Sequence, residues 1–376
     1  MLGEIVGSAG IVGDRTRTAS LWHAGRTRPP LCNDEEQHVK VLRIHGVEDI
    51  RIGEEPLPEP GEGQVRVRMA YGGICGSDLH YYFHGASGVF VLREPLTPGH
   101  EMAGTVDADP SGEFAPGTPV TIAPATYGEP QPGLEDRPHL WPGGAYFGSA
   151  STTPHTQGGM AEYKVVPSSM LRVLPDGLDL TTAALAEPLS VALHAVTIAG
   201  SLEGKSVLVI GCGPIGLCVV AAALARGAAS VGASDMLAGP LERAAGLGAS
   251  ETYPAADGGV PQTHYDVVFE CSGVAPAIST AIAAARRAGT VVQVGNLPNE
   301  PIGVNLGPMV SKELVYRATF RFNDEMDDAV ALLAANPGMA AIITHVISAD
   351  DAERAFAVAR DSQASGKVLV ALWPDA

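Results

Sequence analysis

Apolar and polar residues follow different patterns in successive parts of the 376-residue chain. Residues 39–42 and 65–69 alternate apolar and polar side chains, as half-buried strands do. Short strand-like runs and Pro/Gly turns continue to about residue 175, which predicts a β-rich, barrel-like domain. Residues 1–36 mix Gly, Ser, Thr and Arg without a sustained period, so we expect a poorly ordered extension or a start codon assigned too far upstream.

After residue 181 the pattern becomes one of alternating helices and strands. Leu185, Leu189 and Leu193 follow a helical period, and an Ala-rich helix is predicted to end near Arg226. A further helical stretch covers residues 276–287. Strands are expected at residues 206–210, 230–234, 265–270, 290–294, 342–347 and 367–372. Such alternation predicts βαβ units and a parallel sheet.

One uncharged stretch, residues 207–225, is long enough to resemble a membrane span. Its middle reads Gly-Cys-Gly-Pro-Ile-Gly, which would break a helix in lipid, so a buried strand, a turn and a helix fit better. No apolar secretory signal is evident at the N-terminus. We therefore expect no membrane association.

Charge and cysteine content exclude other classes. The formal net charge is −18 and Lys/Arg residues do not cluster, which argues against a nucleic-acid partner. The 42 acidic residues are dispersed, as on a solvated surface. Five irregularly spaced cysteines without a Cys-x-x-Cys pair indicate a reducing, cytoplasmic setting.

A G-x-G-x-x-G motif follows the predicted strand 206–210 and opens a helix, which is typical of a Rossmann dinucleotide site. The first glycine permits the tight turn, the second lets backbone N–H groups approach a pyrophosphate, and the third allows close packing of helix and strand. The motif residues are Gly211, Gly213, Pro214, Ile215 and Gly216.

Asp235 lies 19 residues after Gly216, at the end of the second predicted strand. A carboxylate there can accept hydrogen bonds from both ribose hydroxyls and would repel a 2′-phosphate, which favours NAD over NADP. The alternative is a plain surface carboxylate.

A second motif brings together metal-binding residue types. Cys75 lies in a glycine-rich turn, and His100 and Glu101 follow in another. Sulfur, nitrogen and oxygen ligands suit zinc, and three protein ligands leave a fourth position for water or substrate, as a catalytic site requires.

These motifs resemble the zinc-dependent medium-chain alcohol/polyol dehydrogenases. The resemblance covers about residues 38–374 and includes Gly-x-Cys-Gly-Ser-Asp-x-His, Gly-His-Glu, Glu187-Pro188, the dinucleotide motif and the 25-residue step from Cys75 to His100. It implies a GroES-like β-barrel catalytic domain in two parts, residues 37–190 and 320–376, around a Rossmann NAD-binding domain, residues 191–319. It also implies a homo-oligomer, either a dimer or a tetramer.

The resemblance assigns roles around the metal. Cys75, His100 and Glu101 correspond to zinc ligands, and Glu187 to a carboxylate that approaches the metal directly or through water. An alternative for Glu187 is a helix-start Glu stabilised by the helix dipole.

The resemblance also implies a route for the alcohol proton. Ser77 takes the proton and passes it through cofactor hydroxyls toward His80 and solvent. Asp78 orients a ligand imidazole. The alternative for His80 is a plain surface histidine.

One feature departs from the family pattern. Many members hold a second, structural zinc with four cysteines in a loop of this domain, but residues 123–146 contain no cysteine. His139 and His155 stand too far from other ligands to replace them. We therefore predict one zinc ion per chain.

Several short stretches resemble the L-idonate 5-dehydrogenase branch, close to the sorbitol dehydrogenases. They are residues 80–85, 147–150, 154–159 and 320–322. Tyr82 and Ser149 could hydrogen-bond substrate hydroxyls, and Arg321 could pair with a sugar-acid carboxylate. Arg321 could equally be a structural or interface residue.

The leading hypothesis is NAD-dependent oxidation of L-idonate at C5 to 5-keto-D-gluconate. The alternative enzyme acts on a neutral polyol such as sorbitol or xylitol. A third hypothesis is a non-catalytic binding protein that reuses the fold.

Overall fold

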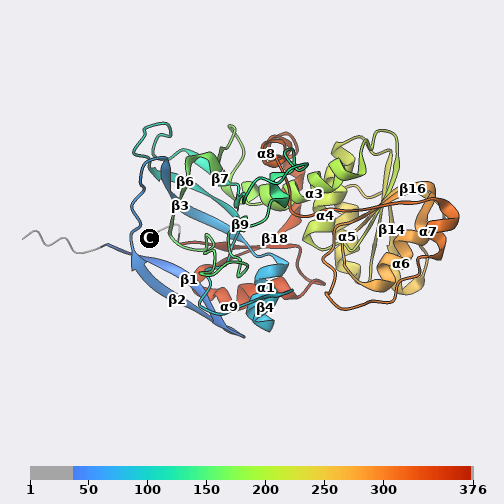
Figure 1. The fold of residues 1–376 in the computed structure, drawn as a ribbon, viewed down its shortest axis with the longest axis horizontal. Coiled ribbons are helices and arrows are strands. Elements are labelled where there is room, and N and C mark those ends of the chain that lie inside the picture. The colour runs from blue at the N-terminus through green and yellow to red at the C-terminus, as the bar shows by residue number, and fades with distance from the viewer. Residues whose placement is uncertain (1–36, 374–376) are drawn as a thin grey trace, which may run out of the picture. The chain divides into compact units, whose positions relative to one another are not determined.

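The computed structural model describes residues 37–373, so the prediction for residues 1–36 lies outside the described part of the chain. Two large sheets organise the described residues (Figure 1). A separate antiparallel hairpin is formed by β1 (His38–Gly46) and β2 (Asp49–Pro56). The four described cysteines are free.

The first sheet is mostly antiparallel, with the strand order β11-β7-β6-β3-β19-β18 and with β10 paired to β3. In β3, Val65, Val67 and Met69 are buried and the residues between them are partly exposed, as the alternating sequence predicted. Strands from both ends of the chain meet here, because β19 pairs with β3. The strands are β3 (Gln64–Gly73), β6 (Glu101–Ala108), β7 (Pro119–Ile122), β10 (Tyr163–Pro167), β11 (Leu171–Val173), β18 (Ile343–Ser348) and β19 (Lys367–Ala371).

The second sheet has six parallel strands in the order β14-β13-β12-β15-β16-β17. Its order reverses between β12 and β15, at the point where ligands bind in open α/β sheets. The strands are β12 (Ser206–Ile210), β13 (Ser230–Asp235), β14 (Glu251–Pro254), β15 (Tyr265–Glu270), β16 (Ala285–Gln293) and β17 (Val315–Ala318). The apolar stretch 207–225 is divided between β12 and the following helix, as predicted.

Helices connect and cover the strands (Figure 1). They are α1 (Gly76–His84), α2 (Leu180–Ala183), α3 (Ala186–Ala199), α4 (Pro214–Ala225), α5 (Ala238–Gly246), α6 (Ala275–Ala284), α7 (Gly307–Lys312), α8 (Met326–Ala335) and α9 (Ala352–Arg360). In the part of the chain that the structure describes, no helix combines the length and apolar character needed to cross a membrane.

One predicted helix was too long. The helical pattern of residues 276–287 ends three residues early in the structure, because Ala285 pairs with Tyr265 and begins β16. Backbone pairing in the sheet overrides the local helical preference of Arg286 and Arg287.

Short strands and 3-10 helices complete the fold. They are β4 (Ala86–Ser87), β5 (Phe90–Val91), β8 (Ala125–Thr126), β9 (Ala145–Tyr146), η1 (Pro138–Leu140), η2 (Ser168–Met170), η3 (Ala255–Asp257), η4 (Pro337–Ile342) and η5 (Ala349–Asp351).

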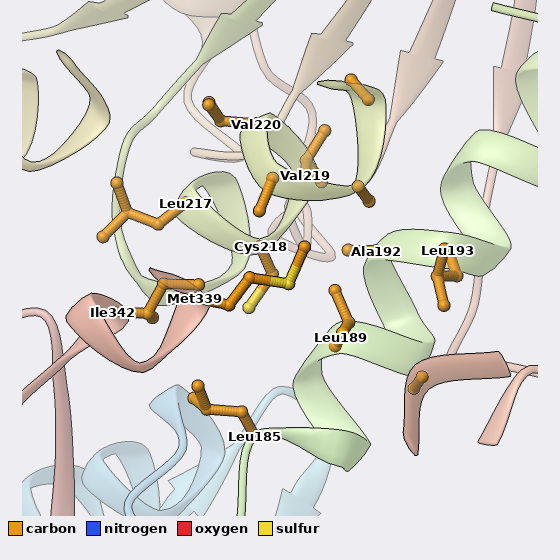
Figure 2. Close-up of a cluster of buried hydrophobic side chains, with 14 of the residues drawn as sticks. Leu185, Leu189, Ala192, Leu193, Leu217, Cys218, Val219, Val220, Met339 and Ile342 are labelled. Atoms are coloured by element: carbon orange, nitrogen blue, oxygen red, sulfur yellow. The ribbon is translucent and has the colours of Figure 1, made fainter. Parts of the chain in front are cut away.

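A large apolar core joins α3, α4 and η4 (Figure 2). Leu189 and Leu193 of α3 pack with Leu217 and Cys218 of α4, and all are nearly inaccessible. Each fully buried leucine contributes roughly 2 kcal/mol to folding. This packing fixes the first turn of α3, which carries Glu187.

Candidate active site

Cys75 stands at the junction of β3 and α1. It is the N-cap residue of α1, and its backbone N–H donates a hydrogen bond to Asp78 Oδ2 at 2.9 Å. The other Asp78 oxygen accepts from Gly99 N–H at 3.3 Å. Asp78 is fully buried, and burial raises the pKa of its carboxyl group. Asp78 therefore ties the turn that carries Cys75 to the turn that precedes His100.

His100 and Glu101 enter the site from the start of β6. In the antiparallel ladder of β3 and β6, Glu101 lies opposite Gly73. A Cβ atom at Gly73 would lie 2.0 Å from Glu101 Oε2, so glycine is required for this approach. Gly99 has a φ of +96°, a conformation that favours glycine and forms the turn immediately before His100 and Glu101.

Cys75, His100 and Glu101 form one converging group. One ligand atom from each lies within 4.8 Å of the other two, and among residues 37–373 this is the one group of three or more potential ligands with such spacing. His100 and Glu101 are buried and Cys75 is partly exposed. The structure thus brings together the three ligands predicted from the sequence.

The surroundings fit a bound cation. His100 Nδ1 and Glu101 Oε2 are buried side-chain atoms with no hydrogen-bond partner among the described residues. Burial alone would lower the pKa of His100, but negative charge on Cys75, Asp78 and Glu187 raises it well above its usual range. Zinc would neutralise this excess of negative charge and would use the sulfur, nitrogen and oxygen donors present.

Lys367, at the start of β19, is a buried partner of Glu101 that the sequence did not reveal. Its Nζ lies 2.6 Å from Glu101 Oε1 and also donates to the carbonyl oxygen of Ile74 at 3.0 Å. Burial would lower the pKa of Lys367, but the Glu101 carboxylate raises it. The ammonium group of Lys367, at the start of β19, therefore holds the Glu101 carboxylate in place.

Glu187 and Tyr146 form a second buried pair beside this group. The Tyr146 hydroxyl donates a hydrogen bond to Glu187 Oε1. Burial raises the pKa of both side chains, and the Glu187 charge raises that of Tyr146 further. The ring of Tyr146 also lies edge-on to His100, with centroids 5.4 Å apart.

Ser77 and His80 lie on α1, immediately after Cys75. Ser77 is half-buried and His80 is exposed. Residues three apart share a helix face, so the two side chains project on the same side. The proton route through these two residues stays a prediction.

Arg321 lines a cavity of about 230 Å³. Its guanidinium lies 4.2 Å from the ring centroid of Tyr146 and 4.8 Å from that of Phe320. Cys75, His100 and Glu101 do not line this cavity. Arg321 and Tyr146 form the link between the cavity and Glu187.

The structure places the other two predicted substrate residues differently. Tyr82 is buried in the barrel core, 5.0 Å from Phe356 between ring centroids, so its hydroxyl does not join the site. One step along α1 rotates the side chain by about 100°, and Tyr81 instead has its hydroxyl bonded to Ala150 N–H at 3.0 Å.

Ser149 is partly exposed, and its hydroxyl donates to Ser151 Oγ at 3.0 Å. Ser151, rather than Ser149, lines the cavity beside Arg321. The hydroxyl group predicted for substrate binding is thus engaged within its own loop.

The glycine-rich turn lies between β12 and α4 as predicted. Gly211 has a φ of +87°, and Gly213 is the N-cap of α4, whose first turn contains Pro214, Ile215 and Gly216. A Cβ atom at Gly216 would lie 1.9 Å from the carbonyl oxygen of Gly211, so only glycine fits. A Cβ at Gly213 would meet no atom within 4 Å, which leaves open space where a pyrophosphate would approach.

Asp235 ends β13, next to this turn. Its Oδ2 accepts from Cys212 N–H at 2.7 Å and its Oδ1 from Leu237 N–H at 3.0 Å. Both oxygens are therefore oriented by the backbone, and the side chain remains partly exposed. The next two residues, Met236 and Leu237, offer no positive charge.

The two histidines considered for a second metal site have other neighbours. His155 accepts from Arg93 N–H at 2.9 Å, and its other ring nitrogen lies 3.0 Å from the carbonyl oxygen of Thr152. His139 is less isolated than its sequence position suggested. Its ring centroid lies 4.8 Å from that of His194, and its Nδ1 lies 3.1 Å from Asn323 Oδ1. One zinc per chain remains a prediction.

Family models and known relatives match most of the chain. The alcohol dehydrogenase GroES-like domain matches residues 61–176, and the zinc-binding dehydrogenase model matches residues 214–335. These matches and the six-stranded parallel sheet confirm the predicted fold class, a GroES-like domain with a Rossmann-type sheet.

Three comparisons extend over most of the molecule. L-idonate 5-dehydrogenase (NAD(P)(+)) of Escherichia coli strain K12 is 33% identical over 297 residues, which are 77% of this chain and 86% of that protein. Sorbitol dehydrogenase of Gallus gallus is 34% identical over 337 residues, 85% of this chain and 92% of that protein. The crystal structure of the Escherichia coli L-idonate 5-dehydrogenase aligns with a TM-score of 0.83 at 31% identity, covering 89% of this chain and 98% of that one.

Proposed function

Because the chain belongs to the zinc-containing medium-chain dehydrogenase family, we propose that it oxidises L-idonate at C5 to 5-keto-D-gluconate with NAD. The family and its relatives establish a zinc-dependent dehydrogenase that acts on CH–OH groups of polyols or sugar acids. The choice of L-idonate within that class is the proposal, and it rests on Arg321.

The charge of the cavity supports a sugar acid. Among the described residues that line it, Arg321 carries a positive charge and none is Asp or Glu, while burial lowers the pKa of His139 and favours its neutral form. This lining contrasts with the formal net charge of −18 of the whole chain. A guanidinium pairs bidentately with a carboxylate, so Arg321 would hold the C1 end of the substrate.

The remaining residues would orient the alcohol and carry its proton. Zinc held by Cys75, His100 and Glu101 supplies Lewis acidity, which lowers the pKa of a hydroxyl. NAD bound at the glycine-rich turn would accept the C5 hydrogen as hydride, and Ser77 would accept the hydroxyl proton. The proton would then reach exposed His80 through hydroxyl groups of the bound cofactor and pass to solvent. Asp78, predicted to orient a ligand imidazole, would act on His100 indirectly, because its oxygens accept from the N–H groups of Cys75 and of Gly99, the residue before His100.

A neutral polyol such as sorbitol is the second candidate. Sorbitol dehydrogenase of Gallus gallus is as similar to this chain as the idonate enzyme is. The Arg321 guanidinium has two aromatic neighbours, Tyr146 and Phe320, which suits a structural role without an anionic ligand.

A substrate panel with Arg321 variants tests the choice. L-idonate is expected to give a higher kcat/KM than sorbitol or xylitol, followed by the absorbance of reduced nicotinamide. Arg321→Leu should lower kcat/KM for L-idonate at least tenfold, because a hydrogen-bonded charge is worth about 1.5–3 kcal/mol. Arg321→Leu should lower kcat/KM for sorbitol less.

Arg321→Lys keeps the positive charge but loses the planar guanidinium group. Its kcat/KM for L-idonate should lie between those of the wild type and Arg321→Leu. Sorbitol turning over much better than L-idonate would favour the neutral-polyol candidate.

Cofactor choice is tested at Asp235. The wild type is expected to prefer NAD over NADP in kcat/KM. Asp235→Ala should lower kcat/KM with NAD about tenfold or more, because charge-assisted hydrogen bonds to the ribose are lost. The ratio of kcat/KM with NAD to kcat/KM with NADP should therefore decrease. Asp257→Ala, at an exposed carboxylate beyond β14, serves as the control. A clear NADP preference of the wild type would contradict the assignment.

The proton route is tested at Ser77. Ser77→Ala is expected to lower kcat about a hundredfold, in the usual range for loss of a proton-transfer group, while the zinc content is unchanged. Ser87→Ala, at a half-buried serine in β4, is the matched control. An unchanged kcat in Ser77→Ala would refute the relay role.

A further inference from the structure

Tyr146 touches three parts of the candidate active site. Its ring lies edge-on to His100 and beneath the guanidinium of Arg321. Its hydroxyl donates to Glu187. The side chain is only 6% exposed, so these contacts are fixed by packing rather than by solvent.

Glu187 lies beside the ligand group but outside it. The carboxylate is buried and interacts electrostatically with His100 and Glu101. Even so, it is not among the ligand atoms that converge within 4.8 Å, which belong to Cys75, His100 and Glu101. One of its oxygens is engaged by Tyr146.

A catalytic zinc with three protein ligands needs its fourth position free for substrate. A buried carboxylate next to such an ion is a competing fourth ligand, because carboxylate oxygen binds zinc well. We propose that Tyr146 is a positioning residue whose hydroxyl holds Glu187 away from the metal and keeps the fourth position open. This proposal rests on the metal site described above.

The packing explains why the hydroxyl can do this. Tyr146 is in β9 and Phe147 N–H donates to the Pro124 carbonyl, so the backbone is fixed. The Arg321 guanidinium and the His100 ring limit rotation of the phenol ring. Glu187 lies in the first turn of α3, whose following residues are packed in the apolar core. These contacts support the hydrogen bond between the Tyr146 hydroxyl and the Glu187 carboxylate.

Tyr146→Phe tests the proposal, because it removes the hydroxyl and keeps the ring contacts to His100 and Arg321. Glu187 is then free to bind the metal in competition with substrate. We expect KM for the best substrate of the panel to rise about tenfold, with a smaller change in kcat. In competition with a chelator, the variant should bind zinc about tenfold more tightly. Replacing a side chain that contacts a metal ligand typically changes metal affinity by an amount of this size. The visible spectrum of the substrate-free cobalt enzyme should also change.

A double variant and a control make the test specific. Tyr146→Phe/Glu187→Gln should restore KM, zinc affinity and the cobalt spectrum, because a neutral amide is a poor zinc ligand. Tyr265→Phe removes another buried phenol, bonded to Tyr253 at 2.9 Å in the second sheet, and should leave all three unchanged.

Two outcomes distinguish a failure of the role of Tyr146 from a failure of the zinc site on which that role depends. If Tyr146→Phe binds zinc no more tightly than the wild type, with an unchanged cobalt spectrum, the role of Tyr146 is wrong although the metal site stands. If the wild-type enzyme binds no zinc, the metal site itself fails.

Discussion

Cys75→Ala is expected to remove the bound zinc and to lower kcat/KM about a thousandfold or more. Cys75 supplies the sulfur of the ligand group, and its loss leaves two protein ligands, too few for a stable site. The Lewis acid provides several kcal/mol of stabilisation to the developing negative charge, and each 1.36 kcal/mol is about tenfold in rate. Zinc content by elemental analysis and steady-state kinetics check both effects.

Cys218→Ala is the matched control for this experiment. Cys218 is also a free cysteine, but it belongs to α4 and is buried in the apolar core that α4 shares with α3 (Figure 2). Its variant should keep one zinc per chain. Full zinc content in Cys75→Ala would show that the metal is held elsewhere.

Lys367→Met is expected to destabilise the zinc-free protein by about 3–5 kcal/mol, the usual cost of breaking a buried ion pair. Glu101 would lose the ammonium group 2.6 Å away and would remain a buried charge without compensation. Zinc at the same carboxylate would replace part of the missing positive charge, so the loss should be smaller in the loaded enzyme. Urea unfolding with and without zinc measures both values.

Lys312→Met provides the comparison. Lys312 is also buried, but its Nζ donates to three carbonyl oxygens, those of Ile282, Ala283 and Ala285, at 2.7–2.9 Å. Its loss should destabilise the protein equally with and without zinc. If Lys367→Met also destabilised the protein equally with and without zinc, Glu101 would not interact with both Lys367 and the metal.

Much of the fold was predictable from local pattern. The limits of β12 and β15 agree with the sequence prediction, because a parallel strand covered on both faces is a continuous apolar run between turns. The end of α6 was not predictable in this way. Whether residue 285 continues a helix or begins a strand depends on its pairing with Tyr265, which is remote in the sequence.

The candidate zinc ligands were predictable because each is carried by a short local motif. Tyr146 and Lys367 were not, because their partners lie 41 and 266 residues away. A tyrosine before Phe147 and a lysine at the start of the last strand carry no motif of their own. The surroundings of Tyr81 and Tyr82 were not predictable for a related reason. Both are buried in the structure, but the orientation of α1 decides that Ala150 N–H donates to the Tyr81 hydroxyl while the Tyr82 ring packs against Phe356.

The sequence by itself therefore determined the chemistry that is available: three candidate zinc ligands, a glycine-rich turn for a dinucleotide, and Asp235 beside it. Spacing within a motif is local, and local backbone geometry follows from residue type. The tertiary structure decided which buried groups surround that chemistry. Burial makes every unpaired charge costly, so Lys367 must meet Glu101 and Tyr146 must meet Glu187, and only the folded chain brings these partners together.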